Sequence, residues 1–223
     1  MSFIKSRRAI FAVALRAFTI FAISYPLVSQ AKTLISTSAG RVGDTVITTR
    51  EVMLNHLIEG ALFPNEKQVK LQPDQIKSHD FIHETTSVLL EAAIAKEAAA
   101  FDLVPVAKTR LEASVKKVKR VLSRNSIWHE LSPSAAEVKN IVETKLRAKD
   151  FVKFKVDSAT VPISDQEALN YFNANRLKFE NLPFANFKDT IKAYLTKQRV
   201  DARLKDWFDS LQSKYRIRNL LSE

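Results

Sequence analysis

The C-terminal residues RIRNLL, 216–221, place the strongest constraint on the fold of this chain. The segment follows a long helical pattern and is too short to form another helix, so it reads as a strand. A lone strand is not stable and needs a partner. The only other strand pattern is a hairpin over 42–48, in which Gly43 and Asp44 form a two-residue turn. We therefore predict that the two ends pair and that the intervening helices form one closed module.

Composition favours helices for the rest of the chain. Only three of the 223 residues are glycine, and 46% are hydrophobic, which is enough to bury a real core. Capping boxes at Thr48 with Glu51 and at Ser164 with Glu167 predict two helix starts. The fold class predicted is mostly α, with helices at about 49–59, 79–101, 106–124, 132–152 and 164–179, and a long closing helix at about 183–215.

The first 31 residues have the layout of a signal peptide. Basic residues come first, an apolar run over 17–28 follows, and small residues precede a cut after Ala31. The run has about 12 residues, whereas a helix needs about 20 to cross a bilayer. The pair Arg7-Arg8 leaves general and twin-arginine export both open. We predict a cleaved leader, 1–31, and one folded module, 32–223.

Charge and cysteine content indicate which cellular compartment suits this chain. The leader holds four of the 35 Lys and Arg residues and none of the 24 Asp and Glu, so the formal charge of the module is +7 rather than +11. The chain has no cysteine, which excludes a disulfide framework, a thiolate metal site and a cysteine nucleophile. An exported chain without disulfides must rely on its core, and this favours a bacterial periplasm.

The order of the elements resembles that of a known family. The stretches that carry the resemblance are VGDTVITTREV, LLEAAIAKEAAAFDLVPV, SPSAAEVKNIVETKLRAKDFVKFKV, VPISDQEALNYFNANRLKFE and the closing segment from PFANFKDT to RNLL. In their order, the module is similar to the SurA-type periplasmic chaperones and their peptidyl-prolyl isomerase relatives.

The chain departs from the family where the isomerase domain would lie. In relatives a parvulin domain follows the stretch like YFNANRLKF, whereas here Phe179 is followed by four residues and then the closing helix. No parvulin domain fits, so no catalytic residue is transferred and no cofactor is expected. The aromatic residues on both sides of this connection are predicted to be core: Tyr171, Phe172, Phe179, Phe184 and Phe187.

The resemblance implies an ATP-independent holdase that binds unfolded outer-membrane or secreted polypeptides. We expect an apolar groove beside the first helix, since methionine adapts to varied sequences. Basic rims would attract acidic clients. The client-binding residues expected in the groove are Met53, Leu57, Ile58, Leu62 and Phe63.

Two other functions remain open on the sequence. The helix over 108–124 has seven basic residues against Glu112 alone. It predicts a basic surface that binds anionic membranes, formed by Lys116, Lys117, Lys119 and Arg120. Such a surface could also bind nucleic acid, but export from the cytoplasm argues against that ligand. The motif HDFIH, from His79 to His83, resembles the zinc-protease motif HExxH, and a zinc hydrolase is therefore the other alternative function. No third metal ligand lies near it in the sequence, so no metal site is assigned.

Overall fold

The ends of the folded module meet in a small antiparallel sheet. The computed structural model describes residues 36–64, 69–101, 105–179 and 182–223, and the predicted leader with its cut after Ala31 lies outside them. Strands β1 (Ser38–Val42), β2 (Thr45–Thr48) and β3 (Arg218–Asn219) pair in the order β2-β1-β3. Arg41 pairs with Val46 on one side and with Arg218 on the other. The predicted pairing of the two ends is confirmed.

Two glycines allow this sheet to form. Gly43 has a φ of +60°, which other residues adopt only with strain, and it makes the hairpin turn as predicted. At Gly40 a Cβ atom would lie 2.6 Å from Leu89 Cδ1 and 2.7 Å from the carbonyl oxygen of Arg218. Glycine is therefore required where the central strand passes between a helix and the last strand.

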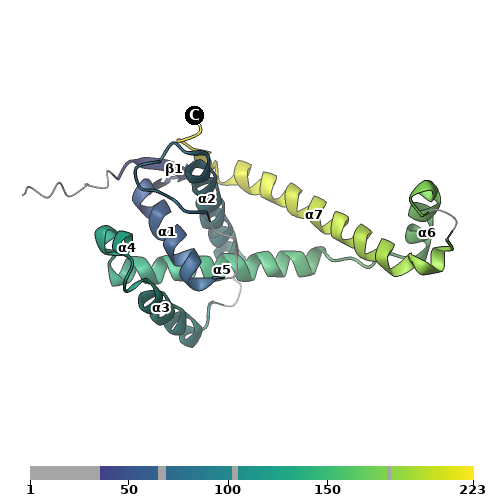
Figure 1. Cartoon of the computed structure of the whole chain (residues 1–223), viewed down its shortest axis with the longest axis horizontal. Helices are drawn as coiled ribbons and strands as arrows, with labels where there is room; N and C mark the ends of the chain where they lie inside the picture. The colour runs from purple at the N-terminus through teal and green to yellow at the C-terminus, as the bar shows by residue number, and fades with distance from the viewer. Residues whose placement is uncertain (1–35, 65–68, 102–104, 180–181) are drawn as a thin grey trace, which may run out of the picture. The chain divides into compact units, whose positions relative to one another are not determined.

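Seven α-helices and two 3-10 helices complete the part of the chain that the structure describes, which is mostly helical as predicted (Figure 1). Their bounds are α1 Thr49–Leu62, α2 His79–Ala100, α3 Lys108–Leu122, α4 Ser126–Leu131, α5 Ala135–Ala159, α6 Asp165–Ala174, η1 Arg176–Lys178, η2 Phe184–Asn186 and α7 Lys188–Lys214.

Several predicted helix bounds are wrong, including the end of α6, which lies at Ala174 rather than Phe179. Helix α1 continues through Gly60 to Leu62, because a helical glycine costs only about 1 kcal/mol. Helix α5 is capped by Ser134 with Glu137, while Ser132 takes a left-handed φ of 46° at the end of α4, a helix that the sequence did not reveal. The closing helix begins at Lys188, after a 3-10 turn.

The main core lies between the sheet and the helices α1, α2 and α5. Phe81, on α2, has no exposed surface in this core, and Phe151, on α5, is 1% exposed in a separate cluster with α2 and α7. Burying each ring stabilises the fold by roughly 2 to 3 kcal/mol. The C-terminal end of α7 is held to α2 through Glu97, whose carboxylate accepts hydrogen bonds from Lys214 Nζ at 2.6 Å and from Tyr215 Oη at 2.7 Å.

A second, aromatic cluster lies at the other end of α7. Phe172 of α6 packs on Phe179, with ring centroids 4.9 Å apart, and Phe179 packs on Phe187 at 5.0 Å. Tyr171 and Phe184 join the cluster, in which Phe172 is 3% exposed. The prediction that these five rings are core is confirmed, with Phe172 fully buried and the other four partly buried.

Candidate functional site

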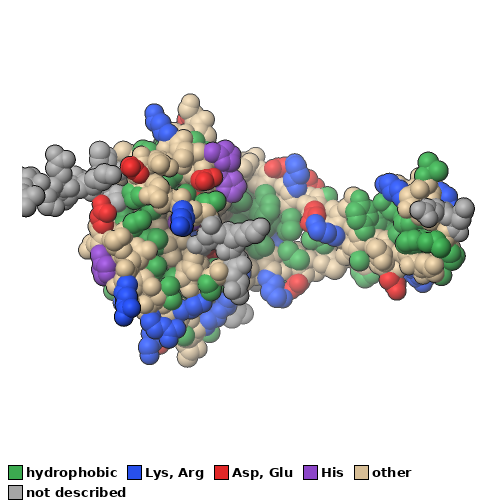
Figure 2. Space-filling view, viewed as in Figure 1, with side chains coloured by type: hydrophobic (Ala, Val, Ile, Leu, Met, Phe, Trp, Pro, Cys, Tyr) green, Lys and Arg blue, Asp and Glu red, His purple; other side chains and the backbone are tan. Residues whose placement is uncertain are grey.

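A hollow of about 530 Å³ opens between α1, α2, α5 and α7. Hydrophobic side chains lie in the recess beside α2 and α7 in Figure 2. Leu90, Val152 and Phe208 are half-buried and therefore present carbon to solvent. The apolar side chains that line the hollow are Phe63, Val69, Val88, Leu90, Ile94, Ala148, Val152 and Phe208.

Apolar residues at helical spacing form the walls of this hollow. Leu90 and Ile94 lie four residues apart on α2, and Ala148 and Val152 lie four residues apart on α5. Residues at this spacing share a helix face, so each helix contributes an apolar stripe. Phe208 adds an aromatic ring from α7. The hollow thus has apolar walls from three helices that are far apart in the sequence.

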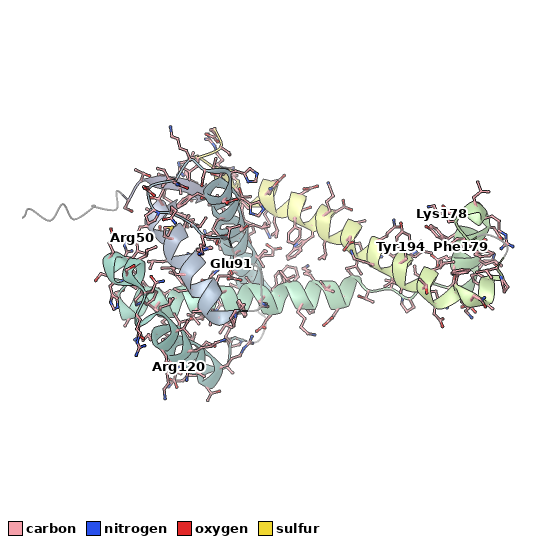
Figure 3. The ribbon with its side chains drawn as sticks, in the orientation of Figure 1. Arg50, Glu91, Arg120, Lys178, Phe179 and Tyr194 are labelled. Carbon is pink, nitrogen blue, oxygen red and sulfur yellow. The ribbon has the colours of Figure 1, made fainter. Side chains whose placement is uncertain are left out.

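The floor of the hollow carries a buried lysine between two carboxylates. The Lys145 side chain is 3% exposed, and its Nζ lies 2.6 Å from Glu59 Oε2 and 2.7 Å from Glu91 Oε2. Glu91 is labelled on α2 in Figure 3. Burial acts to lower the pKa of Lys145, but the charges of Glu91 and Glu59 outweigh it and raise that pKa above its usual value. Burial raises the pKa of Glu91, and Lys145 offsets part of that rise.

Lys145, Glu59 and Glu91 are better suited to a structural role than to catalysis. A lysine whose pKa is raised stays cationic and is a poor nucleophile. Lys145 joins α5 to α1 and α2 through its two carboxylate partners. His56 Nδ1 lies 3.3 Å from Glu84 Oε1 and adds a further link between α1 and α2. The floor therefore fixes the separation of the helices that form the walls.

Three of the five expected client-binding residues are core residues in this structure. Met53 and Ile58 have no exposed surface, and Leu62 is 7% exposed. The expectation of an open groove at these three positions is therefore corrected: their side chains face the sheet and helix α3. Leu57 and Phe63 are half-buried. Of the five, Phe63 lines the hollow.

The hollow also differs from the expected groove in its charge. Its lining includes the carboxylates of Glu59, Glu84 and Glu91 and the ammonium groups of Lys145 and Lys149. The Lys149 Nζ lies 3.5 Å from the centre of the Phe63 ring, in a cation–π contact. Carboxylates and lysines nearly balance, so the expectation of a basic rim that attracts acidic clients does not apply to this hollow.

Sequence reasoning missed Leu90, Val152 and Phe208. Helix α2 is apolar on more than one side, and this pattern predicts burial without distinguishing core from groove. Val152 was assigned to the end of its helix, whereas α5 continues to Ala159. A signal was present in the length of α7, because a helix of 27 residues spans about 40 Å and cannot be covered throughout by one small core.

The two histidines of HDFIH lie in the first turns of α2. His79 and His83 are both exposed, and their ring centroids are 6.4 Å apart. His79 Nδ1 lies 3.7 Å from its neighbour Asp80. Within the described ranges, no group of three or more His, Cys, Asp or Glu side chains is arranged to hold a metal ion.

The predicted basic surface lies on the side of α3 that faces away from the core. Lys116, Lys119 and Arg120 are exposed, and Lys and Arg side chains gather over α3 in Figure 2. Arg120 is labelled on this helix in Figure 3. Lys117 differs, because it is half-buried and its Nζ donates a 2.6 Å hydrogen bond to the carbonyl oxygen of Leu62. Lys117 therefore caps the end of α1.

No protein-family model, curated protein or solved structure matches this chain in the comparisons made.

Proposed function

We propose that the protein is an ATP-independent periplasmic holdase that binds unfolded outer-membrane or secreted polypeptides and has no isomerase activity. The observation that carries the proposal is the hollow between α1, α2, α5 and α7, with half-buried apolar side chains on three of its walls. Exposed apolar surface collected in a recess is typical of a polypeptide-binding site. The signal-peptide layout of 1–31 and the resemblance to SurA-type chaperones support the compartment and the class of client.

The dimensions of the hollow suit short apolar segments. Its volume of about 530 Å³ lies in the range of small-ligand sites, so it accepts a few side chains and not a folded domain. Leu90, Val152 and Phe208 provide carbon surface without a directional hydrogen-bond pattern. Such a surface binds many sequences weakly, because hydrophobic attraction is not directional. Weak and unselective binding is what a holdase requires.

The test compares two valine substitutions in the full chain. Val152→Asp places a charge in the hollow, and Val121→Asp places the same charge on α3, where Val121 is 52% exposed. We expect the Val152 variant to lose most of its ability to keep a urea-unfolded outer-membrane protein soluble on dilution, while the Val121 variant keeps it. Light-scattering at a several-fold excess of chaperone measures the difference.

A crosslinking experiment tests the same proposal without the Val152 variant, in case that variant does not fold. A photoreactive phenylalanine analogue is placed at Val69, at Leu90 or, as the control, at Val121. We expect client adducts from the first two positions and few from the third. If the parent protein neither suppresses aggregation nor forms adducts, or if Val121 crosslinks as strongly as Leu90, the proposal is wrong.

A further inference from the structure

Four cations of α3 and α5 have no ion-pair partner among the residues that the structure describes. Lys116, Lys119 and Arg120 of α3 and Lys139 of α5 are exposed, and no carboxylate in the described part of the chain lies within 4.0 Å of their charged groups. The nearby acidic side chains are engaged elsewhere. Glu112 lies 4.0 Å from Lys108, and Glu137 binds Arg50 at 2.6 Å.

Three of these cations surround a shallow groove. A groove of about 440 Å³ runs between α3 and the first turns of α5. Lys116 and Lys119 line it from α3 and Lys139 lines it from α5, while Leu111, Val115 and Ala135 supply apolar lining and Glu112 adds one carboxylate. We call these seven residues the basic groove, in which three ammonium groups exceed the one carboxylate. Its lysines lie on two helices that pack together, so their grouping depends on tertiary structure.

The chemistry of the basic groove matches a phospholipid headgroup. Uncompensated ammonium groups attract phosphate, and the long lysine side chains can hold a charged group above an apolar strip. The described lining includes no aromatic ring, whereas sequence-tolerant nucleic-acid binding relies on base stacking. The combination of cations and aliphatic lining favours a ligand whose phosphate is attached to an aliphatic body.

We propose that the basic groove docks the protein on an anionic phospholipid surface. Lys116, Lys119 and Lys139 take the phosphate groups, and the aliphatic part of the headgroup region lies against Val115 and Ala135. Arg120 adds a fourth cation beside the groove. None of the helices among the described residues has both the length and the apolar character of a membrane span. The proposal is independent of client binding in the hollow.

The test is vesicle binding by charge-reversed variants of the full chain. The groove variant carries Lys116→Glu, Lys119→Glu and Lys139→Glu. The control carries Lys178→Glu, Lys197→Glu and Lys205→Glu, which change the net charge equally on exposed lysines of η1 and α7. All variants keep the same N-terminal segment, so differences between them report the groove. Vesicles of phosphatidylglycerol and phosphatidylcholine are compared with phosphatidylcholine alone.

Each cation near an anionic surface strengthens binding by roughly fivefold. Removing three cations alone predicts a loss of roughly 100-fold in affinity for the anionic vesicles, and the three added carboxylates increase it, so we expect the groove variant to lose at least that much and the control to lose less than about tenfold. Binding of the parent should weaken as salt rises, since the Debye length shortens. Equal losses in both variants, or equal binding to neutral vesicles, would overturn the proposal.

A fluorescent label locates the contact even if another segment also binds lipid. The chain has no native cysteine, so a polarity-sensitive dye attached to Ser123→Cys reports the end of α3, and one attached to Ser210→Cys reports α7. We expect anionic vesicles to shift the emission of the first dye and leave the second unchanged. If polyglutamate shifts the first dye and vesicles do not, the groove binds acidic polypeptide and the lipid proposal is wrong.

Discussion

Helices α3 and α7 are both basic, but α7 neutralises more of its charges within the protein. Lys197 pairs with Asp201 at 2.5 Å and Lys205 pairs with Asp209 at 2.8 Å, each four residues along the same helix. Lys188 and Lys192 both pair with Asp165 of α6. On α3, Arg110 binds Asp150 of α5 at 2.6 Å and Lys108 lies 4.0 Å from Glu112. Within the described part of the chain, Lys116, Lys119 and Arg120 of the same helix have no carboxylate within 4.0 Å.

The difference fits the two roles proposed for these helices. Exposed pairs at this spacing contribute only about 0.3 to 0.5 kcal/mol each, so the pairs of α7 act mainly to limit its net charge. If the hollow binds clients as proposed, a helix that forms one of its walls benefits from a surface without a strong field. The unpaired cations of α3, Lys116, Lys119 and Arg120, keep their field, and this is the property on which the proposed membrane contact depends.

The largest expected effect comes from a third kind of lysine, the buried Lys145. Removing one partner of a buried ion pair leaves charge without compensation and costs about 3 to 5 kcal/mol. We expect Lys145→Ala to lower the free energy of unfolding by that amount, because Glu59 and Glu91 then face each other. Lys119→Ala, on the exposed face of α3, should change it by less than about 0.5 kcal/mol. Urea unfolding followed by circular dichroism measures both.

A triple variant separates charge from packing at this position. Lys145→Met combined with Glu59→Gln and Glu91→Gln removes all three charges and keeps most of the volume. We expect it to recover most of the stability that Lys145→Ala loses, since a buried ion pair often stabilises no better than a neutral replacement. If Lys145→Ala unfolds at the same urea concentration as Lys119→Ala, the buried triad is not structural.

An intermediate effect is expected from pH at the start of α5. The hydrogen bond from Arg50, with that from the Ser134 backbone, lowers the pKa of Glu137 to about 2. Because the folded pKa lies below the unfolded one, the stabilisation is complete above about pH 4.3 and is lost as the pH falls towards 2. In Glu137→Gln this loss should disappear, so the parent and variant curves converge in acid. Urea unfolding at pH 6, 4 and 3 tests this, with Glu112→Gln as the control that keeps the parent's profile.

The smallest expected effect tests whether position or net charge controls membrane binding. Asp201→Asn with Asp209→Asn leaves Lys197 and Lys205 of α7 unpaired and raises the net charge by two. We expect vesicle affinity to change by less than about threefold and stability by less than about 1 kcal/mol. An increase in affinity of roughly 25-fold, as two more cations at the surface would produce, would contradict docking by the basic groove.

Local patterns were sufficient to predict most of the fold. The hairpin turn at Gly43 and the capping boxes at Thr48 and Ser164 all depend on residues within four positions of each other, and all three are confirmed. The pairing of β3 with β1 was also predictable, since a strand must have a partner and few were present. The helix ends at Leu62 and Ala159 were missed, because packing outweighs the weak end signals there.

The candidate site was less predictable than the fold. Met53 and Leu90 are both apolar residues on helices, yet Met53 has no exposed surface while Leu90 is half-buried at the hollow. No periodicity distinguishes them, because both lie on helix faces that meet other helices. Likewise Lys117 and Lys119 are two residues apart on one basic helix, and only the position of the α1 terminus separates their roles.

By itself, the sequence determined the helical class, the closing strand, the turn and cap positions, and the aromatic cluster at the connection after Phe179. These features follow from short-range sterics, hydrogen bonding and hydrophobic periodicity, which act within one or two turns of chain. The tertiary structure alone decided which apolar stripes remain open and which lysines remain unpaired. Both depend on how helices distant in sequence pack together, as when α5 brings Lys145 to Glu91 and Lys139 to the groove of α3.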